Sequence, residues 1–232
     1  MNLFAYAAPQ RFYGLAGKLI PWFAVSAAVL CLLGLWLGFV EAPTDFQQGE
    51  VYRIIFIHVP AAWMAMFIYL VMAIYAILNL GFSALAPTGA LWAAIALWTG
   101  SLWGKPTWGT YWAWDARMTS TLILLFLYFG YMALTHAIED QNRADRAGSI
   151  LVLVGSINVP IIYFSVNLWN TLHQGSSVNP VSGSKMATVM LLAMLVMMLA
   201  AWCYSVAVVL HRARSIILMR EAHTQWVQQL SK

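Results

Sequence analysis

The sequence predicts an all-α integral membrane protein, and its composition and its apolar segments are the observations behind this prediction. Of its 232 residues, 62% are hydrophobic and only 9% are charged, whereas a soluble domain carries about 25% charged residues. Six apolar stretches are long enough, at about 1.5 Å per helical residue, to cross about 30 Å of hydrocarbon. Because backbone groups in lipid must be hydrogen-bonded within their own segment, we expect these stretches to be helices.

The six predicted transmembrane helices form a single domain over residues 1–232. We expect them near residues 19–40, 54–80, 85–103, 119–138, 149–168 and 186–210. The short connection at 81–87 makes the second and third helices antiparallel neighbours. The tail at 211–232 alternates apolar and basic positions at helical spacing, which fits either an amphipathic helix on the membrane surface or a solvated helix.

The distribution of lysine and arginine predicts the orientation of the helices. An even number of spans puts both termini on one side, and positive residues concentrate on the cytoplasmic side. Eight of the twelve lysine and arginine residues, including Lys232, lie in the two termini and in the loop at 139–148. The other four are Arg53, Lys105, Arg117 and Lys185. We therefore expect both termini in the cytoplasm of a bacterium.

The connections at 41–53, 103–118 and 169–185 then face the periplasm from the inner membrane. The net charge of +4 suits the anionic headgroups of the bilayer and requires no nucleic acid partner.

Common catalytic and redox motifs are absent from the sequence. Cys31 and Cys203 each lie inside a predicted helix, and neither belongs to a C-x-x-C pair or a covalent haem-attachment motif. The chain also lacks H-E-x-x-H, G-x-S-x-G and the phosphate-binding loop G-x-x-x-x-G-K-[ST]. We therefore expect no enzymatic activity, and any ATP hydrolysis must come from a separate chain.

The stretch "WGTYWAWDARMTS" at 108–120 concentrates tryptophan in the predicted periplasmic connection between the third and fourth helices. Six of the twelve tryptophans lie between Trp92 and Trp114, whereas an aromatic belt would scatter them over all helix ends. At helical spacing Trp108, Trp112 and Asp115 share one face. This pattern predicts a flat aromatic platform for a flat apolar ligand.

Three further residues of this stretch contribute to the predicted platform. Gly109 would allow close approach, and Asp115 and Arg117 would anchor or orient the segment. Arg117 would alternatively pair with an anionic group of the ligand, since its planar fork matches a carboxylate.

Two of the five histidines are candidate metal ligands. His58 precedes Pro60, so we expect the second helix to start near Val59 with His58 at its mouth, and His173 follows the fifth helix on the same side. Ionisable residues at this depth usually mark functional sites. Two neutral imidazoles from different helices suit the axial positions of a haem iron, and the lack of thiolates and clustered carboxylates disfavours structural zinc. The other histidines are His136, His211 and His223, which we interpret as polar interface residues.

Three motifs together resemble a known family over nearly the whole chain. "WGTYWAWDARMTS" resembles the tryptophan-rich WWD signature of the haem-handling membrane proteins of cytochrome c assembly. "HVPAAWMAM" around His58 and "WNTLHQGSS" around His173 resemble the flanking histidine motifs of the haem exporter protein C family, also called cytochrome c maturation protein C.

This resemblance implies a haem-handling function with defined roles for the residues. His58 and His173 would be the axial ligands of a transiently and non-covalently bound haem b. The platform for haem and its acceptor would comprise Trp108, Gly109, Trp112, Trp114, Asp115 and Arg117. We expect the haem propionates to face Arg53 or Arg117.

The resemblance also implies partners. The family presents haem at the periplasmic face to a membrane-anchored haem chaperone, which passes it to apocytochrome c. Its members associate with an ATP-binding cassette assembly and a small membrane subunit.

Two other functions compete with this interpretation. A permease that exports haem or another small molecule would use Asn158, Pro160 and Asn167 as a polar pathway, but such a pathway needs polar residues in several spans. A bis-histidine electron-transfer protein would place both ligands inside helices, whereas here they flank connections.

Overall fold

The computed structural model describes residues 8–78, 82–169, 171–173, 178–179, 183–184 and 186–230. Some residues named in the sequence analysis lie outside these ranges. They are Lys185 and Lys232, residues 79–81 of the short connection, and Asn170 and residues 174–177 of the second histidine motif.

The regular secondary structure of the described residues is helical apart from one short pair of antiparallel strands. The long helices are α1 (Pro9–Trp36), α2 (Ile55–Ile77), α3 (Ala86–Trp108), α4 (Ala116–Ala137), α5 (Gln141–Gly155), α6 (Asn158–Leu168) and α7 (Thr188–Arg220). The short elements are a π-helical turn η2 (Leu37–Glu41), a 3-10 helix η3 (Glu50–Ile54), the antiparallel strands β1 (Val178–Asn179) and β2 (Gly183–Ser184), and α8 (Gln225–Leu230).

Five helical segments of the described chain are long and apolar enough to cross a membrane. They are Pro9–Glu41, Glu50–Ile77, Ala116–Ala137, Gln141–Leu168 and Thr188–Arg220. This confirms the all-α, membrane-type fold class. The third predicted span is helical as α3, but its tryptophan, threonine and glycine residues make it less apolar than the other five. The count of six spans therefore stays a prediction.

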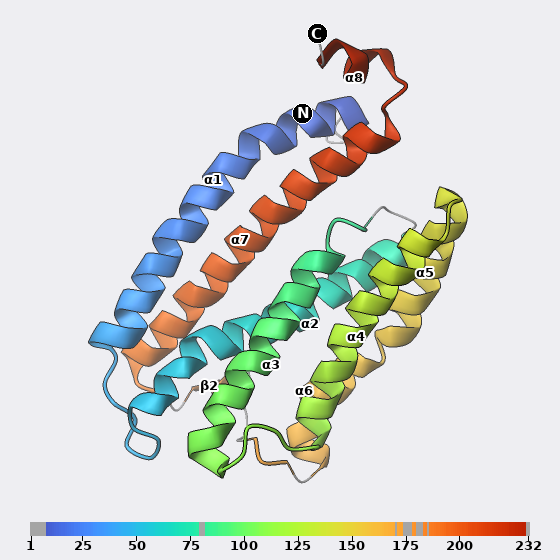
Figure 1. The fold of residues 1–232 in the computed structure, drawn as a ribbon. Coiled ribbons are helices and arrows are strands. Elements are labelled where there is room, and N and C mark those ends of the chain that lie inside the picture. The colour runs from blue at the N-terminus through green and yellow to red at the C-terminus, as the bar shows by residue number, and fades with distance from the viewer. Residues whose placement is uncertain are drawn as a thin grey trace.

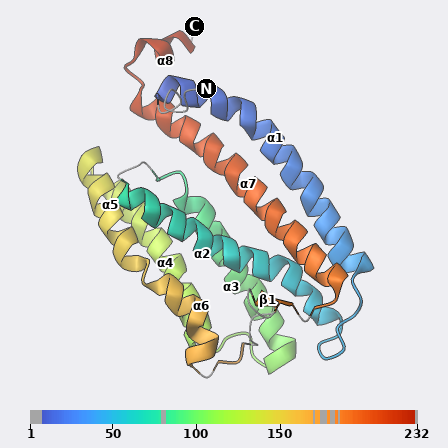
Figure 2. The same ribbon diagram turned by 180° about the vertical axis from the view of Figure 1, so that it is seen from behind.

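The helices form one bundle with its termini at one end (Figure 1). The long helices α1 and α7 pack along each other, α2 packs against α7, α3 and α5, and α4 packs against α3, α5 and α6. Figure 2 shows the same arrangement from behind, with α2 between α7 and the α4–α6 side. The segments at 42–54, 109–115 and 171–173 lie at the end opposite the termini (Figure 1). The side of the membrane that this end faces stays a prediction.

Several helix boundaries differ from expectation, including the starts of α1 at Pro9 and of α5 at Gln141, which were predicted near residues 19 and 149. Helix α2 begins at Ile55, so His58 lies inside its first turn and not before it, because η3 leads directly into α2. The predicted span at 149–168 is divided at residues 156–157. Pro160 lacks the N–H and clashes with the carbonyl four residues earlier, at Ser156, which favours a break at this point. Helix α7 continues to Arg220, past the predicted boundary at 210.

The predicted helical platform at 108–115 is wrong. Helix α3 ends at Trp108 because Gly109 adopts a left-handed conformation, with φ of 80°, and its N–H is bonded to the Lys105 carbonyl. The chain is then irregular until Asp115 starts α4. A Cβ at Gly109 would meet no atom within 4 Å. The glycine therefore serves to end the helix and not to allow close approach.

The bundle core closes around two tyrosines that require a small neighbour. Tyr69 and Tyr128 are fully buried with ring centroids 5.2 Å apart, and the Tyr128 hydroxyl donates to the Ala65 carbonyl at 2.7 Å. Gly89 of α3 lies directly against the Tyr128 ring, where a Cβ would collide with it. This glycine therefore sets how closely α3 and α4 pack.

We expect Gly89→Ala to lower the free energy of unfolding by about 1–3 kcal/mol, because overpacking a rigid core forces neighbouring side chains to move. Gly130→Ala on α4 is the matched control, since its Cβ would lie 3.8 Å from the nearest atom, on Leu151. Thermal unfolding in detergent measures both variants. Equal melting temperatures would show that Gly89 does not set this contact.

Candidate functional site

The first candidate ligand, His58, is held between α2 and α3. Its Nδ1 atom lies 3.0 Å from the hydroxyl oxygen of Thr99, and its ring packs edge-on against Trp103, with centroids 5.6 Å apart. A Cβ at Gly100 would lie 3.0 Å from His58 Cε1. The glycine therefore lets α3 approach the imidazole closely.

Trp103, which packs on His58, is itself fixed by polar and aromatic contacts. Its indole N–H donates to Gln48 Oε1 at 2.7 Å, and its ring meets Tyr52 edge-on at 5.9 Å. The segment before α2 thus fixes the tryptophan that packs on His58.

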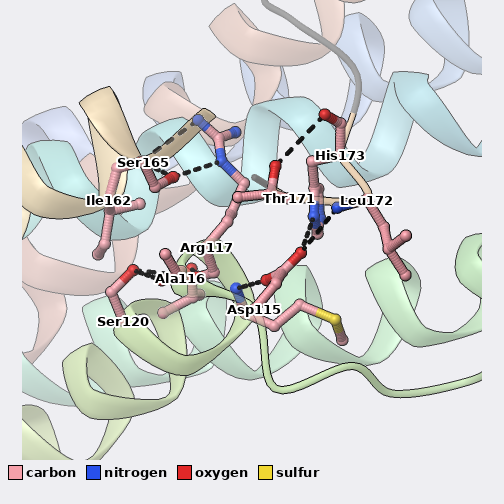
Figure 3. Close-up of polar contacts among 11 residues, drawn as sticks. Asp115, Ala116, Arg117, Ser120, Ile162, Ser165, Thr171, Leu172 and His173 are labelled. Carbon is pink, nitrogen blue, oxygen red and sulfur yellow. Dashed lines mark hydrogen bonds and ion pairs between the residues drawn. The ribbon is translucent and has the colours of Figure 1, made fainter. Parts of the chain in front are cut away.

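The second candidate ligand, His173, is held by Asp115 at the start of α4. His173 Nδ1 lies 3.2 Å from Asp115 Oδ2, and the side chains of the two residues are only 13% and 8% exposed. Burial lowers the pKa of His173, and the Asp115 carboxylate opposes this shift. The lowered pKa favours the neutral imidazole, which is the form that binds a metal. Figure 3 shows His173 and Asp115 facing each other, with Leu172 beside them.

Asp115 has three hydrogen-bond partners, so it organises this part of the site. Its Oδ1 accepts the N–H of Met118 at 2.8 Å, which caps α4, and its Oδ2 also accepts the N–H of Leu172 at 3.3 Å. One carboxylate therefore joins the start of α4 to the segment that carries His173.

The structure brings the two histidines to one region. Both histidines pack against the C-terminal part of α3: the His58 ring contacts Trp103, and the His173 ring contacts Trp108, five residues further along the same helix. The two rings reach this region from α2 and from the segment after α6. In both imidazoles Nδ1 is engaged, and Nε2 has no hydrogen-bond partner within the part of the chain that the structure describes. Two such rings match the paired axial positions of a metal held by a flat ring.

Arg117 is more firmly bound to the protein than the sequence indicates. Its Nε donates to Ser165 Oγ at 3.2 Å, and its Nη2 donates to the carbonyls of Ile162 at 3.3 Å and Tyr163 at 3.5 Å (Figure 3). Arg117 therefore joins α4 to α6, two positions after the Asp115 that holds His173.

Arg53 lies in a different environment from Arg117. Its Nη1 donates to the carbonyls of Gly38 at 2.6 Å and Ala42 at 3.0 Å, and the guanidinium forms an ion pair with Glu50. Arg53 thereby joins η2 to η3, and its charge is already paired.

The tryptophans of the motif have three different positions. The Trp108 ring packs on His173 with centroids 4.8 Å apart, whereas Trp112 and Trp114 meet edge-on at 5.3 Å. The indole nitrogen of Trp112 is buried and has no hydrogen-bond partner within the described residues. Trp114 is 77% exposed. A buried indole donor without a protein acceptor fits a ligand that carries oxygen acceptors.

Thr99 and Trp103 are site residues that the sequence analysis did not identify. Both belong to the stretch "TGSLWG" of α3, which reads as ordinary helix, and only their four-residue spacing places them on one face. Their partner His58 is 41 positions from Thr99, so no local pattern could have shown the contact.

Comparison with known proteins identifies the family. The family model described as "Heme exporter protein C" matches residues 2–228. The chain belongs to the haem exporter protein C family. The proteins of that name from Escherichia coli K12 and Bradyrhizobium diazoefficiens are 46% and 44% identical to it, covering 99% and 100% of this chain and 96% and 91% of their own lengths. The protein of the same name from Paracoccus denitrificans is 40% identical over 95% of both chains.

Membership of the haem exporter protein C family confirms the resemblance found in the sequence and makes this chain a haem-handling membrane protein of cytochrome c maturation.

Proposed function

We propose that this protein binds haem b non-covalently at the end of the bundle opposite its termini and presents it to a periplasmic haem chaperone. His58 and His173 are the axial ligands. The observation that carries this proposal is that both imidazoles pack against the C-terminal part of α3, on Trp103 and Trp108, and that each is held through Nδ1.

The orientation in this proposal follows from the charges. The cytoplasmic excess of lysine and arginine puts the termini inside the cell, so the opposite end of the bundle, with the histidines, faces the periplasm. The third helix, α3, is then a sixth span. It carries Thr99 and Trp103 against His58, so protein contacts bury part of its less apolar surface.

The tryptophans and arginines provide the surroundings of the haem. Trp108 packs beside the His173 ligand, and the unpaired indole nitrogen of Trp112 is a donor for a propionate. Arg117 is better placed than Arg53 to balance the propionate charge, because Arg117 lies two positions after the Asp115 that holds His173, while Arg53 is paired with Glu50. Exposed Trp114 faces the acceptor protein.

The proposed partners follow from the name of the family. An exporter needs an energy source, and an ATP-binding cassette assembly with its membrane subunits and a small membrane subunit would provide it. A permease pathway through this chain itself is less well supported. Asn158 is buried and donates to the Ser120 carbonyl at 2.8 Å, so it holds α6 to α4.

Replacing Trp114 by alanine tests this function. We expect Trp114→Ala to keep bound haem but to reduce the haem recovered on the co-purified chaperone by about tenfold, since an exposed aromatic at an interface contributes about 1–2 kcal/mol. Trp22→Ala on α1, where Trp22 is 75% exposed, is the matched control and should load the chaperone normally. If the Trp114 variant loaded the chaperone with haem normally, Trp114 would be a membrane-interface residue without a role in transfer.

A further inference from the structure

The atoms that bond to each imidazole at Nδ1 differ, and this difference has a consequence for haem release. The inference rests on the proposed function, because it assumes that both rings ligate haem iron. Thr99 is a neutral hydroxyl and Asp115 is a carboxylate, so the two ligands are not equivalent.

The Thr99 hydroxyl fixes the tautomer of His58. Thr99 donates its single proton to the Ile95 carbonyl, with an oxygen-to-oxygen distance of 2.6 Å, so toward His58 it can only accept. His58 Nδ1, 3.0 Å away, must therefore carry the ring proton, which leaves Nε2 as the lone-pair donor.

The orientation of the ring agrees with this assignment. A Cβ at Gly100 would lie 3.5 Å from His58 Nδ1 but 4.0 Å from Nε2. Nδ1 therefore faces α3, and Nε2 is directed further away from it.

Asp115 fixes the same tautomer in His173. An ionised carboxylate only accepts hydrogen bonds, so the 3.2 Å contact between His173 Nδ1 and Asp115 Oδ2 requires a proton on Nδ1. Helix α4 and the Leu172 N–H hold the carboxylate in place. His173 Nε2 is then the atom available to iron.

We propose that Thr99 and Asp115 are positioning residues that present Nε2 of both histidines to the iron, and that His173 is the stronger ligand and His58 the first to be released. A carboxylate bonded to the far nitrogen raises the basicity of a ligating imidazole, and hydrogen bonds to a charged acceptor are about twice as strong as neutral ones. Breaking the iron–His58 bond first would open one face of the haem to an acceptor while His173 retains it.

Carbon monoxide identifies the weaker ligand. Carbon monoxide added to the ferrous protein replaces one axial histidine, and flash photolysis exposes the remaining iron–histidine bond to resonance Raman spectroscopy. We expect the stretching frequency of the wild-type photoproduct to match that of reduced His58→Ala, which keeps only His173. A match with His173→Ala would overturn the order of release. This comparison does not depend on any variant of Thr99 or Asp115.

Variants of the two positioning residues then test their roles. Asp115→Asn should lower the iron–histidine frequency of the photoproduct, and Thr99→Val should leave it unchanged. Thr99→Val should instead weaken retention of haem in the six-coordinate form by about 10- to 100-fold, and Thr99→Ser should restore it. Retention by Thr99→Val equal to that by Thr99→Ser would refute the positioning role.

The same measurements separate this inference from the proposed function. If the wild-type protein lacks a six-coordinate spectrum that depends on His58 and His173, the ligand assignment itself fails. If that spectrum is present but the photoproduct is insensitive to Asp115→Asn, only the inference fails.

Discussion

Asp115→Ala should destabilise the protein by about 2–4 kcal/mol and abolish stable haem binding. The substitution removes the cap of α4, worth about 1 kcal/mol, together with a charged acceptor for the buried His173 ring, worth about 1.5–3 kcal/mol. It also frees the segment at 171–173 from α4. Thermal unfolding and haem content after gel filtration measure the two effects.

Asp140→Ala separates the cap from the site. Asp140 starts α5 in the same way, accepting the N–H of Arg143 at 2.8 Å, but it is exposed and lies at the other end of the bundle. We expect its replacement to cost only about 1 kcal/mol and to leave haem content unchanged. If the two variants behaved alike, Asp115 would be a helix cap without a further role.

Replacing the two histidines should have the largest effect on haem. We expect His58→Ala and His173→Ala each to convert a six-coordinate haem spectrum to a five-coordinate one. The haem content of the double variant should fall by at least about tenfold, because removing even a residue that only supports a metal ligand lowers metal affinity by about that factor. His136→Ala and His211→Ala are controls, since both residues lie toward the end of the bundle that carries the termini. An unchanged spectrum in the double variant would exclude both residues as ligands.

The helices could be predicted from the sequence because apolar length is a local property. The apolar runs located the long helices, although the run at 149–168 is divided between α5 and α6, and the alternation of the spans grouped the same three connections that the structure places at one end. The helix ends were harder to predict. The period of 3.6 residues suggested a helix through 108–115, whereas the backbone of Gly109 ended it at Trp108.

The candidate ligands could be predicted from residue type, but their supports could not. His58 and His173 were identifiable as ionisable side chains near the membrane boundary. Their partners Thr99 and Asp115 lie 41 and 58 positions away, and such contacts depend on how helices pack. Asp115 was singled out, but as an anchor for the tryptophans and not as the partner of His173.

Pulsed electron paramagnetic resonance of the ferric, haem-loaded protein made with nitrogen-15 histidine tests the ligand assignment most directly. We predict couplings from two histidine nitrogens to the low-spin iron in the wild-type protein, and from one in His58→Ala. Coupling to one histidine or to none in the wild-type protein would contradict bis-histidine ligation by this site.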